Sequence, residues 1–150
     1  MGARAAVLTS AILIGTGMVA FAQKVVHPEE FDQAMKTIGA AFDAVKQAST
    51  SKSYVDAKTP LALSRQVLAS TRPFWETSGE PEAVKMVTDT LAKLDALDKI
   101  LSTRAVEAGT VAAGIEDAVR ACDACHAKYR EGNEQTGYRI KTLRNSIPRP

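Results

Sequence analysis

Aromatic residues, cysteine and histidine are all scarce in this chain of 150 residues. Phe, Trp and Tyr together make up 5% of the sequence, which is little for the core of a domain of this size. We therefore expect either an aliphatic core or a core that is partly filled by a group other than an amino acid. The chain has two cysteines and two histidines, so any site built from these residue types is small.

Several motifs of known chemistry are also absent. The sequence contains no P-loop, no G-x-G-x-x-G and no H-E-x-x-H. Its formal net charge of +2 gives no strong electrostatic case for binding nucleic acid or a membrane surface. No segment alternates in the manner of a β-strand, and no internal repeat is present. We therefore expect one all-α domain.

The first 22 residues have the pattern of a secretory signal. Arg4 is their only charged residue, and an apolar stretch leads to the A-x-A cleavage site Ala20-Phe21-Ala22. We expect this segment to be removed, so that the mature protein begins near Gln23 in a bacterial periplasm, without stable membrane insertion. The alternative is an uncleaved membrane anchor, because the uncharged run is just long enough to span a bilayer.

The mature chain reads as four amphipathic helices. The first is expected to begin at Pro28, and the second at Pro60 after a loop over residues 49–58 and a Thr59 N-cap, with a kink or early end before Pro73. The third is expected to run from Pro81 to about Ala108, with Gly109 as its C-cap, and the fourth to end at Gly132. This pattern predicts an antiparallel up-and-down four-helix bundle over residues 23–132, followed by a flexible basic tail over residues 133–150.

The last predicted helix carries Cys122-Asp-Ala-Cys125-His126 on its inward-facing stripe. A structural zinc site needs four ligands, and the only other histidine is His27, although a site with an open position is not ruled out. A redox dithiol typically lies at a helix N-terminus next to a βαβ pattern, whereas this pair lies well inside a helix. A structural bundle with a C-x-x-C that binds no haem is a further alternative.

A covalently bound haem fits this motif best. C-x-x-C-H is the attachment signature of c-type haem. Residues three and four apart share one face of a helix, so Cys122 and Cys125 can bond one edge of a porphyrin while the imidazole of His126 reaches the iron. Such a porphyrin also accounts for a core so poor in aromatic residues. We therefore expect one covalent haem c, with His126 as the proximal iron ligand.

The run Cys122-Asp-Ala-Cys125-His126-Ala-Lys-Tyr129-Arg130 resembles the C-x-x-C-H-x-x-Y/F-R signature of class II c-type cytochromes, the cytochrome c′ and cytochrome c-556 family. The resemblance extends from about Val25 to Gly132 and implies a periplasmic haem protein with the motif on the last helix of a four-helix bundle. It also implies that Arg130 lies near the haem, where its charge favours reduced iron. Tyr129 is expected to pack over the ring with its hydroxyl toward solvent.

The ligand on the side of the iron opposite His126 distinguishes two possible functions. Met35 lies on the core stripe of the first helix, and the segment Met35-Lys36 resembles the family's ligand-bearing Met-Lys pair, although Phe31 departs from the family pattern. We expect Met35 to be the distal ligand of a low-spin, one-electron carrier without enzyme activity, serving periplasmic redox partner proteins. The alternative is a high-spin cytochrome c′ that binds NO or CO at an open distal site. In this family a homodimer forms through the first two helices.

Overall fold

The computed structural model describes residues 24–133 and 135–141, so the expected signal at residues 1–22 and the last part of the expected tail lie outside the described residues. The described chain is mostly helical, as the sequence predicts, but it ends in a small two-stranded sheet that the sequence analysis did not predict. In chain order the elements are α1 (Pro28–Thr50), α2 (Tyr54–Ser70), α3 (Arg72–Thr77), α4 (Pro81–Leu101), α5 (Ala108–Tyr129), β1 (Arg130–Asn133) and β2 (Gly137–Ile140).

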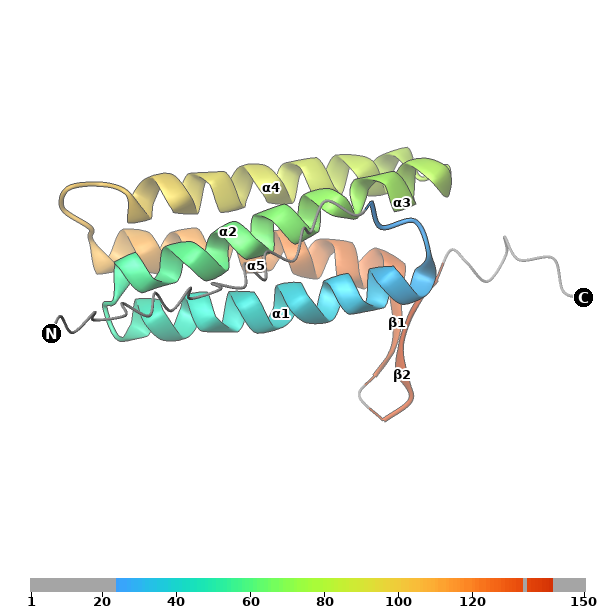
Figure 1. Ribbon diagram of the computed structural model, residues 1–150, viewed down its shortest axis with the longest axis horizontal. Coiled ribbons are helices and arrows are strands. Elements are labelled where there is room, and N and C mark those ends of the chain that lie inside the picture. The colour runs from blue at the N-terminus through green and yellow to red at the C-terminus, as the bar shows by residue number, and fades with distance from the viewer. Residues whose placement is uncertain (1–23, 134, 142–150) are drawn as a thin grey trace, which may run out of the picture.

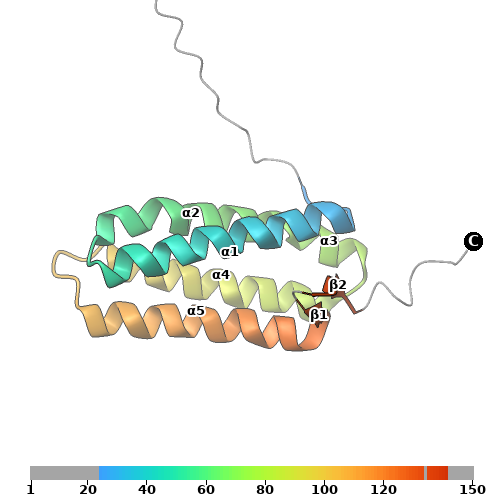
Figure 2. The same cartoon turned by 90° about the horizontal axis from the view of Figure 1, so that it is seen from below.

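The four long helices lie side by side, with α1 and α2 forming one pair and α4 and α5 another (Figures 1 and 2). Helix α2 also packs on α4, which joins the two pairs, whereas α1 and α5 touch little. The short helix α3 caps one end of this arrangement, and the β-hairpin projects beside the same end (Figure 1). The two helix pairs are therefore joined mainly through α2 and α4.

Helix α1 begins at the residue that the sequence predicts. Pro28 occupies its first turn, and the carboxylate of Glu30 accepts hydrogen bonds from the backbone N–H groups of Val26 (3.0 Å) and His27 (3.1 Å). These two bonds lower the pKa of Glu30, because they stabilise its charged form. The start of α1 is thus fixed by local chemistry, which is why sequence patterns locate it well.

The expected start of the second helix at Pro60 is wrong. Helix α2 begins six residues earlier at Tyr54, and the loop before it is Ser51–Ser53 rather than residues 49–58. Proline lacks the N–H that an interior helical position donates, yet the helix continues through Pro60 because Ala57 is completely buried on the packed face. Tertiary packing outweighs the local proline signal here.

The boundary between α4 and α5 also differs from the expectation. Helix α4 ends at Leu101 instead of near Ala108, and Gly109 lies inside the first turn of α5 instead of capping α4. The hydroxyl of Ser102 donates to the carbonyl of Asp98 (2.7 Å) and that of Thr103 to the carbonyl of Ile100 (2.9 Å). Such bonds compete with helical ones and favour ending the helix. The predicted break before Pro73, in contrast, is confirmed by the separation of α2 from α3.

The hairpin corrects the expectation that the chain has no strand, and it places Asn133 and Gly137–Ile140, in the first part of the expected flexible tail, in strands. Strands β1 and β2 pair antiparallel, with Gly132 opposite Tyr138 and Arg130 opposite Ile140. Gly132 has φ +90°, and a Cβ there would collide with the carbonyl oxygen of Gly137, so this position requires glycine. Helix α5 accordingly ends at Tyr129 rather than at Gly132.

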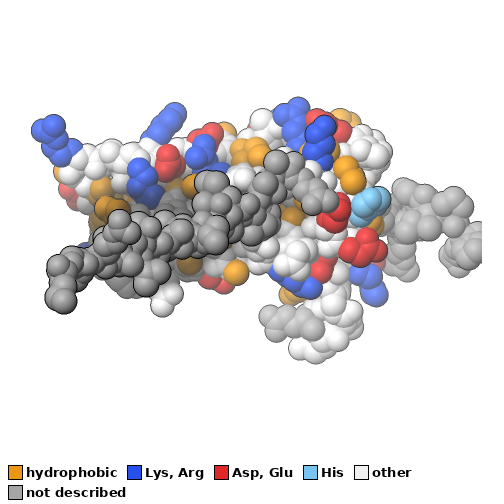
Figure 3. Space-filling model, viewed as in Figure 1, with side chains coloured by type: hydrophobic (Ala, Val, Ile, Leu, Met, Phe, Trp, Pro, Cys, Tyr) orange, Lys and Arg blue, Asp and Glu red, His pale blue; other side chains and the backbone are white. Residues whose placement is uncertain are grey.

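Charged side chains of both signs are interspersed over the face of the molecule in Figure 3. Many pair along a single helix, as Lys36 does with Asp32 (2.6 Å) and Arg72 with Glu76 (2.8 Å). Such exposed pairs contribute little to stability. Among residues 24–133 and 135–141, no helix is both long enough and apolar enough to cross a bilayer.

Candidate cofactor-binding site

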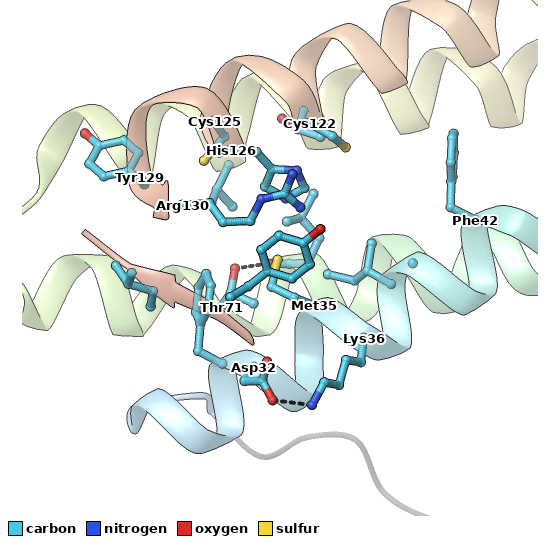
Figure 4. A pocket seen from close by; sticks show the side chains of 18 of the residues that line it. Asp32, Met35, Lys36, Phe42, Thr71, Cys122, Cys125, His126, Tyr129 and Arg130 are labelled. Atoms are coloured by element: carbon cyan, nitrogen blue, oxygen red, sulfur yellow. Dashed lines mark hydrogen bonds and ion pairs between the residues drawn. The ribbon is translucent and has the colours of Figure 1, made fainter. Parts of the chain in front are cut away.

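A cavity of about 1080 Å³ lies between the helices and is the main feature of the interior. It is at the upper end of the size range of ligand pockets, which is roughly 300–1,000 Å³. All four long helices and the hairpin contribute to its wall, and Figure 4 shows side chains of α1 and α5 pointing into it from opposite sides. The cavity therefore has room for a large, mostly apolar ligand.

The three residues of the C-x-x-C-H motif all line this cavity. Cys122, Cys125 and His126 lie in the second half of α5, and each is partly buried (Figure 4). The expected inward position of the motif is thereby confirmed. Their spacing of three and four residues places two thiols and an imidazole along one helix face, directed at one space.

The environment of the two thiols keeps them protonated. Burial raises the pKa of Cys122, and the neighbouring Asp123 raises it further. Burial also raises the pKa of Cys125, with a smaller effect from Cys122. A reactive dithiol needs the opposite shift, because the thiolate is the nucleophile, so these pKa shifts weigh against the dithiol interpretation.

This environment predicts slow thiol chemistry in the protein without a bound group. Iodoacetamide should modify Cys122 and Cys125 more slowly at pH 8 in the folded chain than in the same chain unfolded in urea. The pH midpoint of the reaction should also be higher in the folded chain, because the folded-state pKa values are raised. Single Cys→Ser variants resolve the two rates. A folded-state midpoint below the unfolded one would restore the dithiol interpretation.

The imidazole of His126 is suited to binding a metal. Burial lowers its pKa, and the nearby guanidinium of Arg130 lowers it further, while Asp123 acts in the opposite direction. A lowered pKa keeps the ring neutral at pH 7, which leaves one nitrogen lone pair free to coordinate iron. In the part of the chain that the structure describes, no three His, Cys, Asp or Glu side chains are grouped as a metal site, so the zinc alternative gains no support.

Met35 approaches the cavity from the side opposite His126. It lies on α1, is partly buried, and points toward the space in front of the imidazole (Figure 4). Met86 of α4 also lines the cavity, although no role was predicted for it from the sequence. The only available signal was that it is the other methionine of the mature chain. Two thioethers are thus available on the wall of this cavity.

Arg130 lines the cavity from outside the helix. The fourth helix was expected to extend to Gly132 and so to include Arg130, but Arg130 follows the end of α5 in extended conformation and begins β1. Its guanidinium nevertheless lies beside His126 and stacks on the ring of Tyr138, with 4.4 Å between the guanidinium carbon and the ring centroid (Figure 4). The expected proximity to His126 is correct, although the backbone geometry behind it was not.

Four of the few aromatic residues gather at one end of the cavity. The ring of Trp75 lies 5.1 Å from Phe31, 5.1 Å from Phe74 and 5.0 Å from Tyr129, measured between centroids. All four are at most 8% exposed. Tyr129 packs on Trp75, while its expected packing over a porphyrin ring stays a prediction, and Phe31 at its departure from the family pattern also contacts Trp75. The aromatic cluster is defined as Phe31, Phe74, Trp75 and Tyr129, and three of its members, Phe31, Trp75 and Tyr129, line the cavity.

The buried polar residues of the described chain also line the cavity. Ser64, Thr71 and Thr90 are at most 4% exposed, and each donates its hydroxyl hydrogen to a helix carbonyl three or four residues earlier in the chain. The acceptors are the carbonyls of Pro60 (3.0 Å), Leu68 (2.7 Å) and Met86 (2.8 Å). These three hydroxyl groups already donate to backbone carbonyls. An apolar ligand that packs against them therefore leaves none of these donors without a partner.

Comparison of the chain with protein-family models finds no matching family. No curated protein matches the chain. No solved structure matches it either. The geometry of the cavity and the motif that lines it are therefore the observations that bear on function.

Proposed function

We propose that this protein is a class II-type c-type cytochrome, an antiparallel up-and-down four-helix bundle whose cavity holds one covalent haem c. The observation that carries the proposal is that Cys122, Cys125 and His126 lie on one face of α5 and all line a cavity of about 1080 Å³. Two thiols and a neutral imidazole are the donor set that c-type haem requires, so the residues present fit this group.

In this proposal each residue has a defined task. Cys122 and Cys125 would form the two thioether bonds, and His126 and Met35, which line the same cavity, would be the protein ligands of the iron. The bound haem supplies one-electron chemistry between Fe(III) and Fe(II). The aromatic cluster and the apolar wall exclude water, and the charge of Arg130 beside His126 favours the reduced form.

Such a site transfers electrons rather than transforming a substrate. With His126 and Met35 both on the iron, no coordination position is open to a substrate. We therefore propose a carrier without enzyme activity, located in a bacterial periplasm after removal of residues 1–22, where it exchanges electrons with redox partner proteins. A homodimer through α1 and α2 and the absence of nucleic-acid binding stay predictions.

The decisive experiment is expression with the signal segment in a bacterium that carries the machinery for c-type haem maturation. We expect a red protein whose colour survives acid–acetone extraction and whose mass includes one haem. Replacing both thiols, Cys122→Ser with Cys125→Ser, should abolish the covalent haem completely, because no thioether can form. Val55→Ser is the matched control, since Val55 is 81% exposed on α2 and does not line the cavity.

The outcome that contradicts this proposal is equally clear. If the wild-type protein made under these conditions has two free thiols or a disulfide and no added mass, the chain is not a c-type cytochrome. A structural bundle that binds no haem would then be the better interpretation.

A further inference from the structure

The β-hairpin forms part of the cavity wall, and the C-x-x-C-H motif gives its residues no role. Arg130, Tyr138 and Ile140 line the cavity together with two other hairpin residues. In the antiparallel register Arg130 lies opposite Ile140 and Tyr138 lies opposite Gly132, so these side chains share one face of the hairpin. The cavity is also lined by Glu131 and Arg139, the pair on the opposite face, so the hairpin meets the cavity along its edge as well as through this face.

The hairpin is held firmly to the helix that carries the motif. The backbone N–H of Lys141 donates to the carbonyl of Tyr129 (2.9 Å), and its ammonium group donates to the carbonyl of Ala127 (2.7 Å). Ile140 packs against the hydrophobic core. At the turn, the side-chain oxygen of Asn133 accepts hydrogen bonds from the backbone N–H groups of Gln135 and Thr136, both 3.0 Å. The hairpin is therefore preorganised beside α5 and its position is fixed relative to His126.

The ring of Tyr138 lies in the wall of the cavity that the motif also lines. The planar guanidinium of Arg130 lies 4.4 Å from the ring centroid, and the same guanidinium acts electrostatically on His126. Arg130 is therefore a neighbour of both Tyr138 and His126. The ring is nevertheless 45% exposed, which is unusual for a large aromatic side chain in a cavity wall. Gly132 is the residue paired with Tyr138 in the hairpin, and it has no side chain to fill the space beside the Tyr138 ring.

We propose that Tyr138 is a porphyrin-contacting residue, whose ring packs against the edge of the bound haem and shields it from water. This inference rests on the proposed function. The flat ring face that now receives a guanidinium is equally suited to a porphyrin, since both partners are planar. The contact would cover part of the haem edge, and burial of haem raises its reduction potential. Tyr138 would then act as a positioning residue for the haem and tune its potential.

The test compares Tyr138→Ala, Tyr138→Phe and wild type, all isolated as holoproteins. Covalent haem is first confirmed by mass. We expect Tyr138→Ala to shift the potential downward and to speed reduction by a small hydrophilic reductant, because the haem edge is uncovered. Tyr138→Phe, which keeps the ring, should restore both values to near those of wild type. Val55→Ala removes an exposed apolar side chain elsewhere and should change neither value.

A second measurement needs no alanine variant. In proton NMR spectra of the wild-type holoprotein, the ring protons of Tyr138, assigned by their loss in Tyr138→Phe, should be shifted far from ordinary tyrosine positions by the nearby porphyrin. Ordinary ring shifts together with a wild-type potential in Tyr138→Ala would overturn the inference and leave the proposed function standing. Absence of haem from the wild-type protein would instead overturn both.

Discussion

Replacing Met35 by alanine should change the proposed cytochrome from a closed electron carrier into an open, gas-binding protein. The wild-type iron should be low-spin in both oxidation states, and its ferric form should show the weak long-wavelength band of sulfur-to-iron charge transfer. Met35→Ala should remove that band, make the iron high-spin and allow CO or NO to bind. The potential should fall, because the thioether favours Fe(II). We expect at least a tenfold change in the redox equilibrium constant, which is about 59 mV for one electron.

Met86→Ala is the informative comparison, because Met86 lines the same cavity from α4. If Met35 is the ligand, Met86→Ala should lower stability while leaving the absorption spectrum unchanged. Loss of the charge-transfer band in Met86→Ala alone would move the ligand role to α4. A wild-type protein that is already high-spin and binds CO readily would contradict the electron-carrier assignment and favour the cytochrome c′ alternative.

Replacing Trp75 by alanine should give the largest loss of stability among single substitutions in the cavity wall. Trp75 is 2% exposed and touches Phe31, Phe74 and Tyr129, so its removal leaves a hole where α3, α1 and α5 meet. Substitutions of this kind cost about 3–5 kcal/mol of unfolding free energy. Urea unfolding of the holoprotein, followed by circular dichroism, should show a lower midpoint with an unchanged slope.

Two comparisons calibrate the effect of Trp75→Ala. Trp75→Phe keeps one aromatic ring in the cluster and should cost clearly less. Val55→Ala, at a site 81% exposed, should stay within about 0.5 kcal/mol of wild type. If Trp75→Ala behaves like Val55→Ala, the packing described for the aromatic cluster does not exist in solution.

Features fixed by local chemistry were predictable from the sequence. The start of α1 follows from Pro28 and Glu30, and the break between α2 and α3 follows from Pro73, because each depends on residues within one turn. The inward position of Cys122 and His126 follows from helical spacing alone. These features needed no knowledge of what the helix packs against.

Features that depend on distant contacts were missed. Helix α2 continues through Pro60 because Ala57 is buried against the other helices, and no local pattern shows that burial. Strand β2 has only four residues, three of them exposed, so its pattern is too short to indicate a strand, and its place beside α5 depends on the bond from Lys141 back to that helix. The place of Met86 in the cavity wall likewise depends on how α4 packs beside α5.

The position of the two cysteines in the folded chain limits the order of events during biogenesis. Cys122 and Cys125 lie partly buried on α5, the last of the described helices, and face a cavity enclosed by the others. Helices α1 and α2, which are neighbours in sequence, pack on one another, and contacts of this local kind form quickly. If haem is joined to these thiols as proposed, the attaching enzyme must capture the segment around Cys122 before α5 docks, so attachment would compete in time with folding. Variants that speed the docking of α5 should lower the yield of haem-loaded protein even when they stabilise it.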